Sequence, residues 1–201
     1  MLIEVMCEQR LARGASVLDL FTGSGAIAVA AALAGARAVT AVDVSRRAVI
    51  NARLNATLNG VRVRALRGDL FAPVSQSRFD LIVANPPYIP SESDDLPVRG
   101  PARAWDAGAD GRALLDRLCD QVAPRLALGG AVLVVQSEFA GEREKLDQLS
   151  ARGLIAEVVK RRRGAMGPIV SSRIELLERR GMAAPGQRDE ELLVIRGSRE
   201  R

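Results

Sequence analysis

Short apolar runs alternate with helical segments along nearly the whole chain, and this alternation limits the fold more than any other feature. Most of the runs are apolar at every position, as in strands that are buried on both faces. Strands of this kind, separated by helices, predict an α/β fold with a parallel sheet covered on both sides. The predicted strands are Val17–Phe21, Val39–Val44, Val61–Leu66, Leu81–Ala84, Ala131–Gln136, Ile155–Val159 and Glu191–Arg196. Helices are predicted from about Ala26 and over Arg46–Leu58 (capped by Ser45), Arg112–Arg125, Gly141–Ala151 and Ser171–Arg180.

We expect one domain over residues 1–201, because no linker or internal repeat divides the chain. Residues 1–14 are expected to form a helix before the first strand, residues 15–196 the sheet with its helices, and residues 197–201 a tail. In Val61–Leu66 arginines alternate with small apolar residues, which suits an edge strand whose charges discourage unwanted pairing. The same pattern leaves open an edge that a small activating subunit covers.

The expected location is the cytoplasm. Charged residues interrupt the first apolar stretch, so no signal peptide is predicted. The run Ala26–Ala34 is too short to span a bilayer, and no membrane association is expected. Cys7 and Cys119 lack metal-ligand spacing and are predicted to be buried thiols in a reducing compartment.

Histidine is absent from the chain. This excludes Ser-His-Asp and Cys-His catalysis, zinc sites with histidine ligands and acid–base chemistry by imidazole. An enzyme with this composition must work mainly by positioning, or with carboxylates, lysine or tyrosine, and we expect no metal site.

The net charge of +5 lies entirely in the last quarter of the chain. From Ala151 onward there are 12 Lys/Arg and 7 Asp/Glu, and the densest cluster is "KRRR", Lys160 to Arg163. Two interpretations stay open: a solvated strand end and loop, or a contact for RNA or an acidic protein surface.

The stretch "VLDLFTGSGAIAVA" places Asp19, Gly23 and Gly25 where the first strand turns into the first helix. The glycines allow a tight turn and close approach of a ligand, and the helix start offers free N–H groups. Asp43 ends the second strand, where a carboxylate can accept both hydroxyls of a ribose. Asp69 follows the third strand and is positioned to accept from an adenine amino group. Ligands bind outside the carboxyl ends of the strands in such sheets, so a nucleoside site is expected there.

A nicotinamide enzyme competes with this interpretation, because residues 23–28 also satisfy G-x-G-x-x-A. However, the first strand of that class usually leads directly into the glycines, without an acidic residue such as Asp19. A G-x-S-x-G elbow and a G-x-x-x-x-G-K-[ST] phosphate loop are both missing.

The stretch "FDLIVANPPYIP" leaves the fourth strand through Asn85, Pro86, Pro87 and Tyr88. Each proline forces the preceding residue away from helical angles, and neither has an N–H. A substrate NH2 group could therefore donate to the Asn85 side-chain oxygen and to the Pro86 carbonyl, while Tyr88 offers a flat face. The structural alternative is a rigid exit turn in which Tyr88 caps the core.

Together, Asp19-x-x-x-Gly23-x-Gly25, Asp43, Asp69 and Asn85-Pro86-Pro87-Tyr88 resemble class I S-adenosylmethionine-dependent methyltransferases. More narrowly, the chain resembles the HemK/PrmC-type protein-glutamine N5-methyltransferases, and Ala102–Leu118 is similar to the stretch that follows their Asn-Pro-Pro-Tyr. The resemblance implies a Rossmann-like, seven-stranded, mostly parallel sheet with an antiparallel last strand. It also implies S-adenosyl-L-methionine as the cofactor.

The resemblance further implies which residues form the site. Thr22 to Gly25 approach the methionine part of the cofactor, Asp43 the ribose and Asp69 the adenine. The implied cofactor contacts are Asp19, Thr22, Gly23, Ser24, Gly25, Asp43, Asp69, Leu70 and Asn85. The implied catalytic and substrate-binding residues are Asn85, Pro86, Pro87 and Tyr88, with Trp105 as a further substrate contact.

Two features depart from the family pattern. Phe21 occupies a position that is usually a small residue in the cofactor loop. Only about 16 residues precede the first strand, where family members carry a helical substrate-binding domain or a short segment that completes the pocket. The fuller N-terminal segment is therefore expected to be missing.

Three functions follow from these patterns. The first is methylation of the glutamine side-chain nitrogen in the Gly-Gly-Gln motif of a translation release factor, which would be the protein partner. The second is adenine-N6 methylation of RNA or DNA, because Asn-Pro-Pro-Tyr also serves exocyclic amino groups. The third is a non-catalytic scaffold subunit with a methyltransferase fold.

Overall fold

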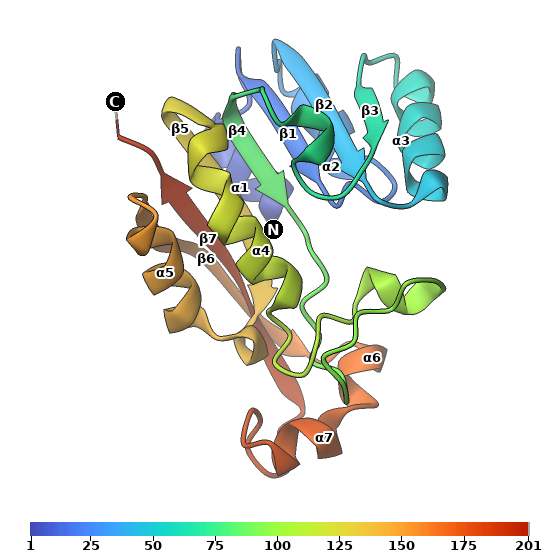
Figure 1. The fold of residues 1–201 in the computed structure, drawn as a ribbon, viewed down its shortest axis with the longest axis vertical. Helices are drawn as coiled ribbons and strands as arrows, with labels where there is room; N and C mark the ends of the chain where they lie inside the picture. The colour runs from blue at the N-terminus through green and yellow to red at the C-terminus, as the bar shows by residue number, and fades with distance from the viewer. Residues whose placement is uncertain (201) are drawn as a thin grey trace.

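The computed structural model describes residues 1–200, which form one seven-stranded sheet in the order β3-β2-β1-β4-β5-β7-β6 (Figure 1). The strands are β1 Ser16–Leu20, β2 Ala38–Asp43, β3 Arg64–Arg67, β4 Phe79–Ala84, β5 Leu126–Ser137, β6 Ile155–Ala165 and β7 Asp189–Ser198. The α-helices are α1 Leu2–Glu8, α2 Ala26–Leu33, α3 Arg46–Leu58, α4 Ala113–Val122, α5 Glu142–Ala151, α6 Pro168–Ser171 and α7 Ile174–Arg179. Short 3₁₀ turns include η2 Pro101–Ala104.

The sheet is parallel from β3 to β5, and β7 pairs antiparallel with both β5 and β6. The expected mostly parallel sheet with an antiparallel last strand is confirmed. The prediction of a charged edge strand is also confirmed, because β3 lies at one end of the sheet. It begins three residues later than predicted, at Arg64.

Successive residues of the central strands bury their side chains on opposite faces, which explains why these strands are apolar throughout. On one face Leu18, Leu20 and Ile82 pack with residues of α4 and α5. On the other face Val17 and Leu81 pack with residues of α1, α2 and α3.

Several boundaries differ from the sequence-based expectations. The helix predicted over Ser171–Arg180 is divided into α6 and α7, and β7 extends to Ser198, so residues 197 and 198 belong to the strand and not to a tail. Cys119 is buried as expected, but the prediction for Cys7 is wrong, because it lies on the exposed side of α1. No helix within residues 1–200 combines the length and the apolarity needed to cross a bilayer.

The basic cluster Lys160–Arg163 lies inside β6 and not in a loop after it. Each of its four side chains forms an ion pair, so their charge is largely neutralised within the protein. Hydrogen bonds from Lys160 and Arg162 lower the pKa of Glu4 to about 2. The pairs join Lys160 to Glu4 and Glu8, Arg161 to Glu142 and Glu191, Arg162 to Glu4, and Arg163 to Asp189.

Candidate active site

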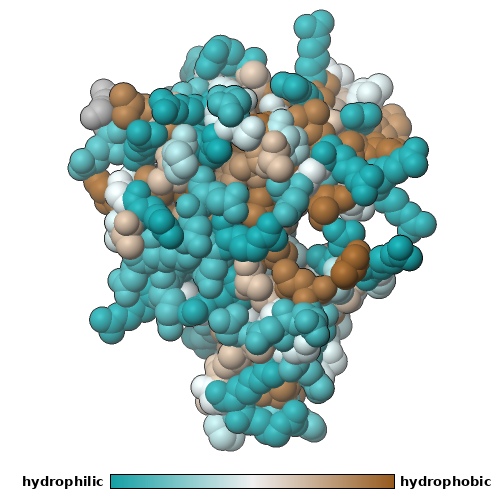
Figure 2. Space-filling model, in the orientation of Figure 1, coloured by the Kyte–Doolittle hydropathy of each residue, from teal (hydrophilic) through white to brown (hydrophobic). Residues whose placement is uncertain are grey.

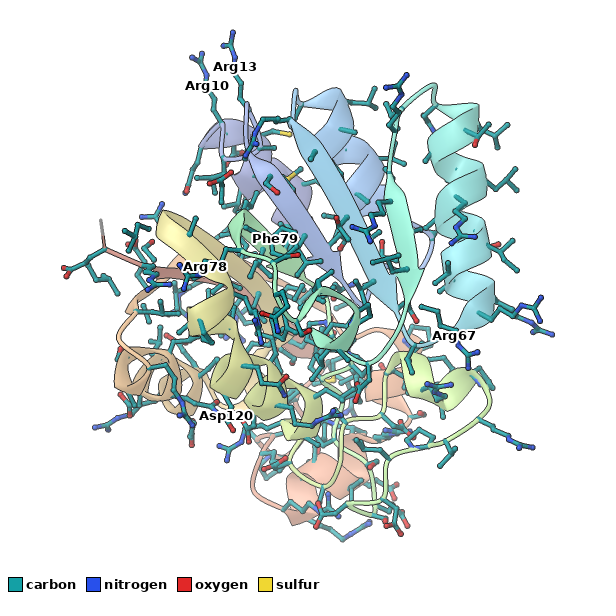
Figure 3. The ribbon with its side chains drawn as sticks, turned by 45° about the horizontal axis from the view of Figure 1, so that its top comes forward. Arg10, Arg13, Arg67, Arg78, Phe79 and Asp120 are labelled. Carbon is teal, nitrogen blue, oxygen red and sulfur yellow. The ribbon has the colours of Figure 1, made fainter. Side chains whose placement is uncertain are left out.

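The predicted site residues gather at one edge of the sheet, where the parallel strands β1 to β4 end. Asp19 lies within β1, Asp43 ends β2, Asp69 follows β3 and Asn85 follows β4. Since β1 lies between β2 and β4, the order of the strands reverses here, which is where ligands bind in open α/β sheets. The surface is hollowed between this edge and the segment that carries η2 (Figure 2). Arg67, at the end of β3, lies at the same edge (Figure 3).

The loop Thr22–Gly25 joins β1 to α2, and its two glycines serve different purposes. Gly23 has a φ of +54° and an open environment, and its N–H donates to Asp43 Oδ2 at 3.0 Å. Gly25, with a φ of +82°, is the N-cap of α2, and a Cβ there would lie 2.7 Å from the Ala52 Cα. Gly25 is therefore needed for the packing of α2 on α3, whereas only Gly23 leaves room for a ligand as the sequence suggested.

The Asp43 carboxylate connects the glycine loop to the start of α3. Besides the Gly23 N–H, it accepts a hydrogen bond from the Ser45 N–H at 2.8 Å. A carboxylate offers about four acceptor positions, so these two contacts leave capacity for hydroxyl groups of a ligand.

Asp19 is completely buried beneath the loop. Its Oδ2 accepts from Thr22 Oγ1 at 2.5 Å and from the Ala28 N–H at 3.0 Å. Its Oδ1 is also buried but has no hydrogen-bond partner among residues 1–200. Burial raises the pKa of Asp19 to about 7, against the effect of these two hydrogen bonds. An unsatisfied buried acceptor at this position fits a cationic or hydrogen-donating ligand group.

Two strained residues border the same edge, and the sequence did not reveal this strain. Phe21 follows β1 with a φ of +56°, and Leu70 follows β3 with a φ of +47°. This conformation costs a non-glycine residue roughly 1–2 kcal/mol. Such strain concentrates at functional sites. Phe21 therefore adopts a left-handed backbone that glycine would tolerate at no steric cost.

Asp69 does not point freely into the site, because it forms an ion pair with Arg117 of α4. Both side chains are about half exposed. Nothing in the sequence near Asp69 indicated this partner, which lies 48 residues away. An adenine amino group at Asp69 would have to share the carboxylate with Arg117.

The acceptor corner, Asn85–Tyr88, combines buried prolines with free hydrogen-bond acceptors. Pro86 and Pro87 are buried, whereas Asn85 is exposed. Among the described residues, neither the Asn85 side chain nor the Pro86 carbonyl has a hydrogen-bond partner. Tyr88 packs against the core on both faces of the sheet. It therefore caps the core, and this packing is compatible with a further role in binding. Burial, and to a smaller extent Glu190, raises the pKa of Tyr88 to about 12.

Trp105 lies beside the acceptor corner because the chain returns to it after η2. The Ile89 N–H donates to the Trp105 carbonyl at 2.9 Å, and the Ala107 N–H donates to the Ile89 carbonyl at 3.1 Å. Further along, Gly111 approaches so closely that a Cβ there would lie 2.5 Å from the Tyr88 carbonyl oxygen. Residues 105–111 thus run alongside the chain that leaves the acceptor corner.

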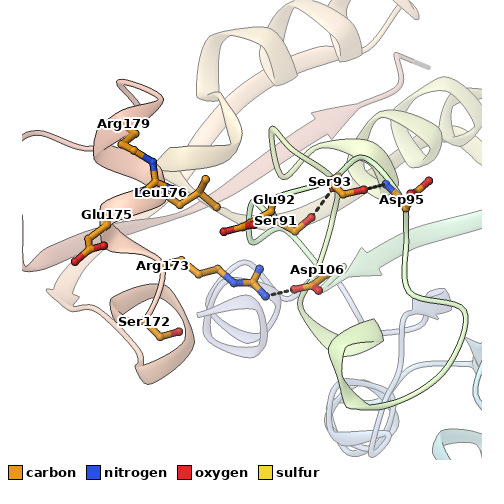
Figure 4. Close-up of a pocket in the computed structure, with 10 residues that line it drawn as sticks. All are labelled: Ser91, Glu92, Ser93, Asp95, Asp106, Ser172, Arg173, Glu175, Leu176 and Arg179. Carbon is orange, nitrogen blue, oxygen red and sulfur yellow. Dashed lines mark hydrogen bonds and ion pairs between the residues drawn. The ribbon is translucent and has the colours of Figure 1, made fainter.

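A cavity of about 400 Å³ lies next to the exit of the corner (Figure 4). Its lining comes from two segments, one between Ser91 and Asp106 and the other between Ser172 and Arg179. Arg173 crosses it to form an ion pair with Asp106 at 2.6 Å. No residue of the loop Thr22–Gly25 lines this cavity. It therefore adjoins the acceptor side of the site and not the glycine loop.

The family model and the two relatives described next are all named as methyltransferases. Residues 1–98 match the family model "Methyltransferase small domain". The chain is 37% identical over 145 residues to the "Putative protein N5-glutamine methyltransferase" of Methanocaldococcus jannaschii, covering 72% of this chain and 73% of that protein. It is 47% identical over 123 residues to the "Release factor glutamine methyltransferase" of Bordetella pertussis, covering 58% of this chain and 45% of that protein. The matched region thus spans less than half of the bacterial relative.

Among solved structures, the fold is similar to that of a chain in the E. cuniculi Mtq2–Trm112 complex. The TM-score is 0.65 at 24% identity, over 99% of this chain and 93% of that chain. That complex is described as responsible for the methylation of the translation termination factor eRF1. At this identity the similarity establishes the fold alone.

Proposed function

The chain belongs to the protein N5-glutamine methyltransferases, and on this basis we propose that it methylates a glutamine side chain of a translation release factor. The observation that carries the proposal is the pair of free acceptors at the end of β4, the Asn85 side chain and the Pro86 carbonyl. A primary amide has two N–H donors, which match these two acceptors. We further propose that residues 1–201 work as a single methyltransferase domain.

The cofactor is S-adenosyl-L-methionine, which supplies an electrophilic methyl group when bound. The donors and acceptors of the site fit it. The orphan Oδ1 of Asp19 suits the cationic aminoacyl group, and the spare acceptor positions of Asp43 suit ribose hydroxyls. We assign Thr22–Gly25 to the methionine part. Asp69 and Leu70 are assigned to the adenine.

The acceptor corner works by orientation. With both amide hydrogens held by Asn85 and Pro86, the glutamine nitrogen has a defined direction toward the end of β1. Orientation and desolvation supply most of the catalysis in such a displacement. No general base has to act before the attack, because the proton can leave the nitrogen afterwards. The absence of histidine agrees with this mechanism. Tyr88 and Trp105 are proposed to contact the flat amide and its neighbours.

A protein acceptor is favoured over adenine in nucleic acid. Residues 1–150 carry no net charge. The one dense basic cluster, Lys160–Arg163, is paired with carboxylates. The cluster that was expected to contact RNA is therefore already paired within the protein, which leaves that contact without support. The short edge strand β3 stays the proposed position for a small activating subunit.

Methyl transfer to a purified release factor tests the proposal directly. When the protein and S-adenosylmethionine are incubated with the release factor, the factor should gain one methyl group on its Gly-Gly-Gln glutamine. A Gln→Ala version of the factor should gain none. The reaction should be repeated with radiolabelled cofactor in whole lysate, followed by nuclease or protease treatment. Label that resists protease but is lost with nuclease would replace the protein acceptor with a nucleic acid.

Replacement of Asp43 with alanine should weaken cofactor binding by roughly 1.5–3 kcal/mol, because charge-assisted hydrogen bonds and the anchor of the Gly23 N–H are both lost. Calorimetric titration with S-adenosylhomocysteine measures the change in dissociation constant. Asp147→Ala is the matched control, because its carboxylate is 75% exposed and lies on α5. Equal affinities of the two variants would remove Asp43 from the cofactor site.

A further inference from the structure

The segment between β6 and β7, residues 166–188, holds the chain immediately after the acceptor corner. Arg173 Nη1 donates to the Pro90 carbonyl at 2.8 Å, and Nη2 forms the ion pair with Asp106. The Arg173 side chain is only 22% exposed and the Asp106 side chain 16%. One guanidinium thus joins Pro90, in the irregular chain after β4, to the segment that carries Trp105. Figure 4 shows its ion pair with Asp106.

Arg180 makes a second connection from the same segment. Its Nη1 donates to the carbonyls of Ser91 at 2.7 Å and Ala109 at 2.6 Å, and its Nη2 donates to the Glu92 carbonyl at 3.0 Å. These backbone acceptors lie in irregular chain, where no β-ladder would satisfy them. Arginine suits this task because its planar group carries five donors in a fixed arrangement.

An apolar contact accompanies the two arginines. The segment has a small core of its own, formed by Val170, Leu177 and Ala183 with Phe139, and Ile89 packs against it. Ile89 directly follows Tyr88 in the chain. The residues 89–92 are therefore fixed on one side by the backbone of residues 105–108 and on the other by the segment 166–188.

We propose that Arg173 and Arg180 are positioning residues for methyl transfer. They touch neither the cofactor loop nor the acceptor atoms. Instead, they fix the carbonyls of residues 90–92, and so set the direction in which Asn85 and Pro86 present their free acceptors. Small displacements of such groups cost a large part of the rate, because orientation is the main contribution of this site. The inference rests on the proposed function for its catalytic consequence.

The test compares Arg173→Ala, Arg173→Lys and Arg180→Ala with the control Arg188→Ala. Arg188 lies in the same segment, but its side chain is exposed and, within residues 1–200, donates only to the carbonyl of its neighbour Gln187. Arg173→Ala should lower kcat for release-factor methylation at least about tenfold, with the affinity for S-adenosylhomocysteine within about twofold of wild type. Arg173→Lys should be intermediate, and added guanidinium should restore part of the Arg173→Ala rate. A variant that was merely less stable would gain nothing from guanidinium.

A second measurement does not require methyl transfer to a protein substrate. Trp105 is the single tryptophan of the chain, so its fluorescence reports on the segment that Arg173 holds. Acrylamide quenching should rise in Arg173→Ala and Arg180→Ala and stay unchanged in Arg188→Ala. If wild type methylates no release factor but the quenching changes as stated, the proposed acceptor fails and the positioning contact stands. If wild type is active and Arg173→Ala matches Arg188→Ala in kcat and in quenching, the positioning role is overturned.

Discussion

Asn85→Ala should lower the rate of methyl transfer by about 10²–10³-fold, with the fold almost unchanged and a much smaller loss of cofactor affinity, since Asn85 is only one of several implied cofactor contacts. The rate falls because the amide nitrogen loses one of its two fixed hydrogens, and with it the orientation on which the site depends. The fold is spared because Asn85 is exposed and its side chain bonds no described residue. Single-turnover methylation, thermal unfolding and titration with S-adenosylhomocysteine measure the three quantities on one protein.

The control variants separate the loss of hydrogen bonding from the loss of side-chain volume. Asn85→Asp keeps an acceptor oxygen and should retain partial activity. Asn51→Ala removes an exposed asparagine of α3 and should behave as wild type. Turnover of Asn85→Ala at the wild-type rate would make the Asn-Pro-Pro-Tyr corner a purely structural exit turn.

Asp19 should make the cofactor-free protein less stable as the pH rises. Its pKa is raised from the ordinary 3.8 to about 7, mainly by burial. Between these two values the native state therefore binds a proton that the unfolded chain has released. Stability from this group is present below the unfolded pKa and is lost as the pH rises through the native one. The shift corresponds to a loss on the order of 4 kcal/mol between pH 4 and pH 8.

Asp19→Asn isolates this effect, because asparagine keeps the shape but does not titrate. Urea unfolding at several pH values should show the wild type falling relative to Asp19→Asn as the pH rises. Asp147→Asn, at an exposed position of α5, should follow the wild type throughout. A constant difference between wild type and Asp19→Asn would mean that the carboxyl is not perturbed in the native state.

Most of the fold could be predicted from local sequence features. The helix α3 has the predicted bounds, because Ser45 accepts from the Ala48 N–H at its start and Gly60 follows its end. The prediction for β6 stopped at Val159, six residues early, because four successive cations do not look like a strand. Those cations are tolerated only because α1 and β7 supply carboxylates from more than 20 residues away, which no local pattern reveals.

The same distinction holds for the site. Motif spacing placed Asp19, Asp43, Asp69 and Asn85 at one sheet edge, since parallel strands end together. It could not show that Gly25 is required by Ala52 of another helix, or that Asp69 pairs with Arg117. Arg173 and Arg180 were invisible for the same reason, because they reach acceptors more than 70 residues earlier in the chain.

The position of β7 has a consequence for synthesis on the ribosome. Although it is the last strand to be made, it lies between β5 and β6 inside the sheet. Until Asp189–Ser198 has left the exit tunnel, β6 has no neighbour and one side of β5 is open. Pairings between such distant segments form late, and unpaired edges invite aggregation. The nascent chain should therefore stay dependent on chaperones until β7 has emerged, and then close its sheet in a single late step.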